Sequence, residues 1–98
     1  QHTQTVKERV ATALLRLADK LGERNEKGVL LEVPLSRADL AGLARTTPES
    51  ASRVMSEWKK LGVIQSGRRW TALVDTEFLV AEAGLARDGA SAPSSAAK

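Results

Sequence analysis

The feature that most constrains the fold of this chain is a pair of short helices separated by about two or three residues. The first is expected to start at Ser36, because its hydroxyl and the carboxylate of Asp39 can satisfy free amide groups at a helix N-terminus. It should run to about Arg45. The second is expected after Thr47, since threonine caps helices and Pro48 suits the first helical position. So short a connection indicates that the two helices are neighbours in space.

Apolar residues give each of these helices an inner face. The expected inner residues are Leu40, Leu43 and Ala44 in the first helix, and Val54, Met55, Trp58 and Leu61 in the second. Ala41 and Gly42 are small enough to admit a close neighbour, and Gly62 supplies the stop of the second helix. Trp58 falls in step with the core stripe, so core packing is favoured there over stacking on single-stranded nucleic acid, and more weakly so at Trp70.

A longer helix and a strand are predicted before this pair. From Thr5 to Leu21 apolar residues recur at spacings of three and four, and Gly22 then supplies a stop. The stripe consists of Val6, Val10, Ala13, Leu14, Leu17 and Leu21. "ERNEKG" follows as a polar loop, and "VLLEV", bounded by Gly28 and Pro34, is predicted to be a strand.

A hairpin and a last helix are predicted after the pair. "VIQS" and "WTALV" are short apolar runs around a turn that contains Gly67, Arg68 and Arg69, so the hairpin tip is basic. "TEFLVAEAG" predicts a short helix with Phe78 and Leu79 turned inward. The order of elements is that of a winged helix: an α+β, mostly α fold with a small antiparallel β wing. The expected domain is residues 1–84, and residues 85–98, which are small, polar and without periodicity, should be a disordered tail.

The composition argues for a binding domain. A chain of 98 residues is long enough for one domain with a small core. It has no cysteine, and its one histidine, His2, has no neighbouring residues with which to form a catalytic triad or a metal site at a recognised spacing. We therefore expect no enzyme activity and no cofactor. No apolar run approaches the roughly 20 residues of a membrane span, which indicates a soluble, cytoplasmic chain that does not bind a membrane.

Charge is unevenly distributed along the chain. Residues 36–70 hold seven Lys and Arg against three Asp and Glu, a net charge of +4. Residues 71–84 hold three acidic residues and no base, a net charge of −3. The basic segment would attract a polyanion, although such an excess is equally common on an ordinary solvated face.

Three residues near the start of the second helix are candidates for reading bases. Glu49, Ser52 and Arg53 lie three and four positions apart, so they share one face opposite the core stripe. Arginine can donate two hydrogen bonds to guanine, glutamate can accept one from cytosine, and serine suits several bases. The alternative is an ion pair from Glu49 to Arg53 on a solvated face. The helix-turn-helix context favours base reading over this ion pair.

Other residues are candidates for phosphate contacts. Ser36, Arg37, Thr47 and Ser50 lie at the two helix starts, where hydroxyls and free amides suit a phosphate. Plain helix capping is the equally favoured alternative for each of these four residues, and it is compatible with a phosphate contact. Arg68 and Arg69 at the wing tip suit phosphate or the minor groove, and a solvated hairpin tip is the alternative for them.

These residues resemble the C-terminal DNA-binding domain of the Crp/Fnr superfamily of bacterial transcription regulators. The resemblance covers roughly residues 5 to 75, from "TVKERVATALLRLADKLG" to "SGRRWTALVD". It is specific in the pattern of Glu49, Ser52 and Arg53, which is similar to the recognition helix of the Fnr branch, whose Glu, Ser and Arg read a TTGAT-like half-site. The cyclic AMP receptor protein branch has an Arg where this chain has Pro48, which argues against its TGTGA-type half-site. Arg45 also departs from the pattern, because helix-turn-helix motifs usually have a left-handed Gly there.

The resemblance implies partners and a longer protein. Family members carry an N-terminal sensory barrel and a long dimerisation helix, so residues 1–4 are expected to be a remnant of a linker or of that helix. The implied partner is a near-palindromic double-stranded DNA site bound by a homodimer. The loop Glu23 to Lys27 lies where some relatives touch RNA polymerase, and a plain solvated loop is the alternative. A winged helix that serves protein association only is the rival function, and an exposed apolar patch would favour it.

Overall fold

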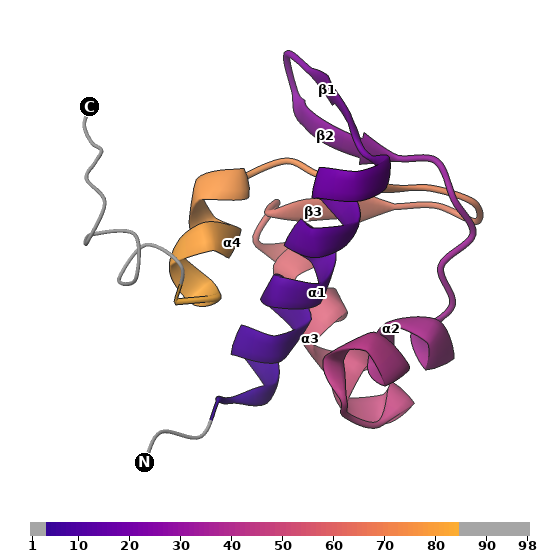
Figure 1. Ribbon diagram of the computed structural model, residues 1–98, viewed down its shortest axis with the longest axis vertical. Helices are drawn as coiled ribbons and strands as arrows, with labels where there is room; N and C mark the ends of the chain where they lie inside the picture. Colours follow the sequence, from indigo (N-terminus) through magenta and orange to yellow (C-terminus); the bar gives the residue numbers. More distant parts are fainter. Residues whose placement is uncertain (1–3, 85–98) are drawn as a thin grey trace.

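The computed structural model describes residues 4–84, which form four helices and one antiparallel sheet. The helices are α1 (Val6–Leu21), α2 (Arg37–Ala44), α3 (Pro48–Lys60) and α4 (Thr76–Glu82). The strands are β1 (Glu23–Asn25), β2 (Gly28–Leu31), β3 (Ile64–Ser66) and β4 (Thr71–Leu73). The expected α+β winged helix is confirmed: α2 lies at the N-terminal end of α1, the sheet lies at its other end, and α3 runs from α2 toward the sheet (Figure 1). His2 and the expected tail, residues 85–98, lie outside the described residues.

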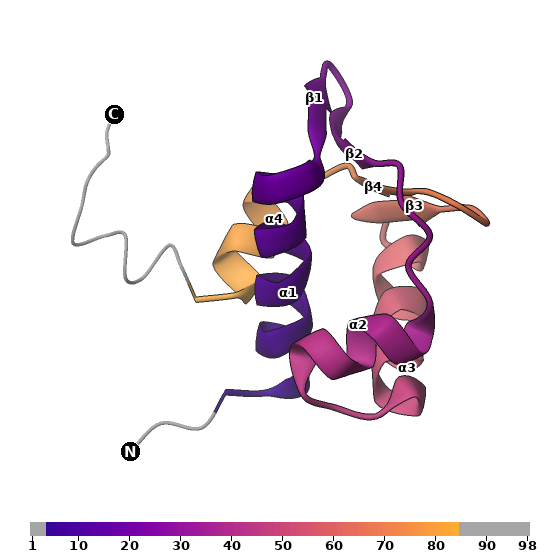
Figure 2. The same ribbon diagram turned by 45° about the vertical axis from the view of Figure 1, so that its right-hand side comes forward.

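The sheet is larger than the expected two-stranded wing. Its strand order is β1-β2-β4-β3, so the first hairpin and the wing hairpin form one sheet through pairing of β2 with β4 (Figure 2). The prediction of a polar loop at residues 23–28 was wrong in part, because β1 pairs with β2, with Glu23 opposite Leu30. All three residues of β1 are exposed, so main-chain hydrogen bonds form this strand and no apolar alternation marks it in the sequence. The strand expected at residues 29–33 runs from Gly28 to Leu31.

Gly28 is required where β2 begins. Its φ of 129° lies in a region that residues with a side chain rarely adopt. A Cβ atom there would also approach the main-chain oxygen of Leu73 in β4 to 2.0 Å. Gly28 therefore permits both the turn from β1 and the close packing of β2 against β4.

The helix starts follow the local signals in the sequence. Thr5 forms a capping box with Glu8, and Ser36 forms one with Asp39. In each box the hydroxyl of the cap accepts from the amide of the acidic residue, and the carboxylate accepts from the amide of the cap. Thr47 caps α3, whose first residue is a proline. The predicted starts of α1, α2 and α3 are thus confirmed.

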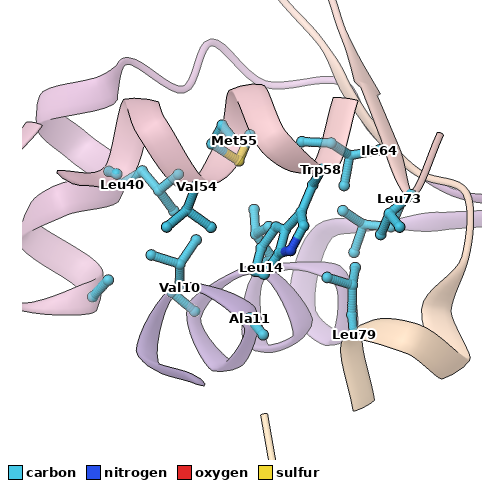
Figure 3. Close-up of a cluster of buried hydrophobic side chains, with 14 of the residues drawn as sticks. Val10, Ala11, Leu14, Leu40, Val54, Met55, Trp58, Ile64, Leu73 and Leu79 are labelled. Atoms are coloured by element: carbon cyan, nitrogen blue, oxygen red, sulfur yellow. The ribbon is translucent and has the colours of Figure 1, made fainter. Parts of the chain in front are cut away.

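The core lies between α1, α3 and the sheet. Trp58 is fully buried and points from α3 toward α1 (Figure 3). Its ring meets that of Phe78 of α4 in a T-shaped contact, with ring centroids 6.3 Å apart. The other fully buried large side chains are Val10, Leu14, Leu31, Leu40, Met55, Ile64, Leu73 and Leu79. The prediction that Trp58 packs in the core is confirmed, and α4 is held to the core by its aromatic and leucine side chains.

Three leucines that were expected to face inward are exposed. Leu21 and Leu61 lie at the C-terminal ends of α1 and α3, with 53% and 60% of their surface exposed. The helical spacing of apolar residues continues to these two ends, but the neighbouring elements no longer cover the helix there. Leu43 of α2 is 54% exposed, because the inner face of this short helix consists of Leu40, Ala41 and Ala44. Trp70 is also partly exposed, at 38%.

The described helices are too short or too polar to cross a membrane. Residues 4–84 also contain no group of three or more His, Cys, Asp and Glu side chains that could hold a metal ion.

Candidate nucleic-acid interface

The outer face of α3 carries the three candidate base-reading residues on one surface. Glu49, Ser52 and Arg53 line a shallow depression of about 650 Å³ together with Ser56, Glu57 and Lys60. Glu49 and Arg53 are exposed, and no ion pair joins them in the described structure. The face is therefore polar along its length, with the side chains of Glu49 and Arg53 available to a ligand.

Three further polar residues of this face were missed by sequence reasoning. Ser56, Glu57 and Lys60 are exposed and continue the surface of Ser52 and Arg53 along α3. Their positions, three and four residues further on, are the signal that could have identified them. The depression thus extends beyond the first turns of α3.

The turn between α2 and α3 is formed by Arg45 in the left-handed conformation, with φ 55° and ψ 52°. The amide of Thr46 donates to the oxygen of Ala41 at 2.9 Å, and the amide of Arg45 donates to that of Gly42 at 3.3 Å. This pair of bonds is the Schellman motif, which usually has glycine at the left-handed position. Arg45 therefore takes the backbone shape that glycine usually provides, at a cost of about 1 kcal/mol.

Arg9 of α1 supports this turn, and no sequence signal indicated it. Its Nε donates to the main-chain oxygen of Ala44 at 2.9 Å, at the last residue of α2. Its guanidinium also donates to the main-chain oxygen of Gln4. One side chain therefore connects the segment before α1 with the start of the turn.

A second contact from α1 reaches the candidate interface. Nζ of Lys7 donates to Oε2 of Glu57 at 2.8 Å. This hydrogen bond raises the pKa of Lys7 above its usual value, because the carboxylate favours the charged amine, while partial desolvation acts in the opposite direction. Both groups are substantially exposed, with side-chain exposures of 42% and 48%, so solvent screens the pair.

The start of α2 leaves amide groups available beside a basic side chain. Oγ of Ser36 accepts from the amide of Asp39 at 2.9 Å, so this hydroxyl serves as the helix cap. The amides of Arg37 and Ala38 have no partner among the described residues. The Arg37 side chain is half-buried at this same helix end. The geometry suits a phosphate oxygen on the amides of the first helical turn.

The start of α3 is more fully satisfied. Oγ1 of Thr47 accepts from the amide of Ser50 at 3.1 Å, and the amide of Ala51 donates to the oxygen of Thr47. Pro48 has no amide hydrogen to offer. Capping is thus present at Thr47, and Glu49 is the residue of the first turn whose amide stays unbonded in the described structure.

The wing tip presents two exposed arginines. Arg68 and Arg69 lie in the turn between β3 and β4, and the amide of Gly67 donates to the oxygen of Trp70 at 2.9 Å across that turn. A Cβ atom at Gly67 would meet Nε1 of the Trp70 ring at 2.3 Å, so this ring packs directly on the turn backbone. The partly exposed Trp70 thus supports the tip that carries the two arginines.

Comparison with known proteins now identifies the family. The sequence profile of the Crp-like helix-turn-helix domain matches residues 8–82, which include every helix and strand except the first residues of α1. The chain belongs to this family. The Crp-like chain is 34% identical over 92 residues to the transcriptional regulator LdrP of Thermus thermophilus, covering 91% of this chain and 46% of LdrP. It is 27% identical over 85 residues to the transcriptional activator protein FnrA of Stutzerimonas stutzeri, covering 87% of this chain and 35% of FnrA.

Solved structures of family members show the same fold. A CRP-family transcriptional regulator of Thermus thermophilus matches with a TM-score of 0.72 and 31% identity, over 84% of this chain and 42% of that one. The CO-dependent transcription factor CooA of Carboxydothermus hydrogenoformans matches with a TM-score of 0.71 and 26% identity, over 79% and 36% of the two chains. The Crp-like chain therefore spans less than half the length of these relatives. All of them are named as transcription regulators or factors, which agrees with the expectation of a binding domain rather than an enzyme.

Proposed function

We propose that this Crp-like domain binds double-stranded DNA as the DNA-reading part of a transcription regulator, with α3 in the major groove. The observation that carries the proposal is the outer face of α3, where polar and charged side chains line a shallow depression with no apolar residue among them. An association surface would need an apolar patch there, and this face has none within the described structure. The relatives named as transcription regulators support the same function.

Three side chains of this face are assigned to the bases. Arg53 donates two hydrogen bonds to a guanine, Glu49 accepts one from a cytosine, and Ser52 contacts a neighbouring base. The absence of an ion pair between Glu49 and Arg53 in the described structure supports these roles, because neither side chain is held by the other. A TTGAT-like half-site follows from the similarity of this pattern to the Fnr branch.

Contacts to phosphates would position α3 in the groove. Arg37 and the free amides at the start of α2 are assigned to one phosphate, and Arg68 and Arg69 of the wing to the neighbouring backbone. The hydroxyls of Ser36 and Thr47 act first as helix caps, and they and Ser50 lie where they could add a hydrogen bond to the same strand. These contacts carry affinity without sequence information.

The intact regulator is proposed to act as a dimer on a near-palindromic site, with residues 1–84 as the DNA-binding domain. Each α3 would then read one half-site, and two half-sites would raise the affinity beyond that of one domain. Contact with RNA polymerase through residues 23–27 is proposed on the resemblance alone. In this structure these residues form β1 and the exposed turn before Gly28.

The experiment that tests this function uses a set of duplexes in which each position of a TTGAT half-site is varied singly. Arg53→Ala should lose about 1 to 3 kcal/mol of discrimination at one G·C pair, and Glu49→Ala should relax the choice at a neighbouring pair. The control is Arg68→Ala, which removes a phosphate contact and should weaken binding to all sequences alike.

Two results would contradict the proposal. If Arg53→Ala weakened every duplex equally, Arg53 would be another phosphate contact and the Fnr-like assignment of α3 would fail. If the affinity of the wild-type chain for duplex DNA did not change between about 50 and 200 mM salt, the phosphate contacts would be absent and the domain would not bind DNA as proposed.

A further inference from the structure

A second hollow of this molecule lies away from the outer face of α3. It is a half-open groove of about 770 Å³ between α1, the C-terminal end of α2 and Ala83, just after α4. On α1 it is lined by positions 9, 12, 13, 16, 17 and 20, which form one side of the helix. Lys7, which contacts α3, does not line it, and the groove shares no residue with the depression on α3.

The rim of this groove is basic. Arg9, Arg16, Lys20 and Arg45 line it, and no acidic residue does so within the described structure. Arg9 is bonded to main-chain oxygens. Arg16, Lys20 and Arg45 are exposed, and their side chains have no hydrogen-bond or ion-pair partner among residues 4–84. The groove therefore carries four positive charges without a counter-charge of its own.

The lining also contains apolar side chains that the fold leaves uncovered. Leu43 is 54% exposed, and Leu17 is half-buried on the α1 side. Gly42 next to Leu43 has open space around it, with no atom within 4 Å of the place where a Cβ would be. A ligand in the groove can thus cover leucine surface and reach the basic rim at the same time.

From this combination we propose that the groove is a docking site for an acidic protein segment with leucine-like side chains. The phosphate backbone of a nucleic acid would neutralise the arginines and the lysine of the rim, but it would leave Leu17 and Leu43 in water. An amphipathic acidic segment satisfies both, since its apolar side chains cover the leucines and its carboxylates meet the arginines and the lysine. Because the groove and the outer face of α3 are separate, the segment can bind while α3 is occupied.

The proposed occupant is an acidic partner segment rather than residues 85–98 of this chain. Residues 85–98 begin two positions after Ala83, but they carry Arg87 and Lys98 against Asp88, a net charge of +1. A segment with this net positive charge does not complement a groove lined by four basic side chains. An acidic partner does, and complementary charge would also speed its encounter with the groove.

The test uses the whole 98-residue chain and a fluorescein-labelled peptide of leucine and glutamate, with the leucines three and four residues apart. The fluorescence anisotropy of the peptide should rise on binding. The double variant Arg16→Glu with Lys20→Glu should weaken binding by about tenfold or more, because it reverses two rim charges. Leu43→Ser should weaken it independently of salt. The matched control is Lys59→Glu, an exposed charge reversal on α3 at a residue that lines neither hollow, which should leave binding within about twofold.

Further arms locate the site and separate the possible occupants. Amide chemical shifts should change at Leu17, Lys20 and Leu43 and stay constant along α3. Replacing the glutamates of the peptide by glutamine, or its leucines by serine, should abolish binding. A random-sequence duplex should not displace the peptide.

Several outcomes would overturn the proposal. It is wrong if Arg16→Glu with Lys20→Glu behaves like Lys59→Glu, or if the chemical-shift changes fall on Ser52 and Arg53. The groove is a DNA contact if duplex DNA displaces the peptide and if Arg16→Glu with Lys20→Glu weakens DNA binding as strongly as it weakens peptide binding. If an unlabelled peptide of residues 85–98 displaces the probe, the groove accepts the chain's own end. None of these results depends on whether α3 reads a base sequence, so the two proposals fail separately.

Discussion

Nε of Arg9 donates to the main-chain oxygen of Ala44 at 2.9 Å, and this bond ties the first helix to the end of α2. The last carbonyl groups of a helix lack partners within the helix, and Arg9 provides one for Ala44. The same guanidinium holds the oxygen of Gln4, just before α1 begins. The turn between α2 and α3 is therefore fixed from outside as well as by its own Schellman bonds.

Arg9→Met should lower the free energy of unfolding by about 1 to 2 kcal/mol, because it removes charge-assisted hydrogen bonds and keeps most of the apolar stem. Urea denaturation measures the change. Arg16→Met is the matched control, since Arg16 is an exposed arginine of the same helix whose side chain makes no hydrogen bond in the described structure. Equal losses in the two variants would show that the bond to Ala44 contributes nothing.

Arg45→Gly should raise the free energy of unfolding by about 1 kcal/mol, because glycine adopts the left-handed conformation without the steric cost of a Cβ. The midpoint of thermal unfolding should rise by roughly 4 to 8 °C in a domain this small. Arg45→Ala is the control: it removes the same side chain beyond Cβ and keeps the strain. A gain in Arg45→Ala as large as in Arg45→Gly would place the effect in the arginine side chain rather than in the backbone.

Gly28→Ala and Gly42→Ala should change stability in opposite directions. At Gly28 a Cβ meets the Leu73 oxygen and the backbone is strained, so a loss on the order of 3 kcal/mol is expected. At Gly42, inside α2, a Cβ meets nothing within 4 Å, and alanine should add about 0.5 to 1 kcal/mol. Calorimetry of the two variants checks both signs. A stable Gly28→Ala protein would mean that β2 can move away from β4.

The Lys7 and Glu57 pair should show a small, salt-sensitive coupling in a double-mutant cycle of Lys7→Met and Glu57→Gln. The pKa of Lys7 is raised in the folded state by its hydrogen bond to Glu57. The contribution of this shift to stability is therefore full below the usual pKa of lysine and is lost as the pH rises through the raised value. Additive single variants at low salt would indicate that the contact does not stabilise the fold.

Local signals in the sequence predicted the helix starts, and the reason is that each cap acts within a few residues. Ser36 with Asp39, and Thr47 before Pro48, supply the capping hydrogen bonds of their helix starts from within three residues. The polar face of Glu49, Ser52 and Arg53 was also predictable, because helical spacing alone places the three residues together.

Other features could not be predicted because their causes lie elsewhere in the chain. The exposure of Leu61 depends on where the neighbouring elements end, which helical periodicity does not contain. β1 forms by main-chain pairing with β2 and buries no side chain, so its sequence has no apolar pattern that would mark a strand. Arg9 acts on a main-chain oxygen 35 positions away, and no residue type marks such an acceptor.

The pairing of β2 with β4 has a consequence for how such domains can diversify. Leu31 and Thr71 are opposite partners in that ladder, so the segment between them begins and ends at neighbouring positions of the sheet. Residues 32–70, with both helices of the turn motif and most of the wing, therefore form a cassette with adjacent ends. Recombination between related genes could exchange this cassette whole, provided that its inner face still fits α1. DNA preference could then change in a single event while the scaffold around it stays the same.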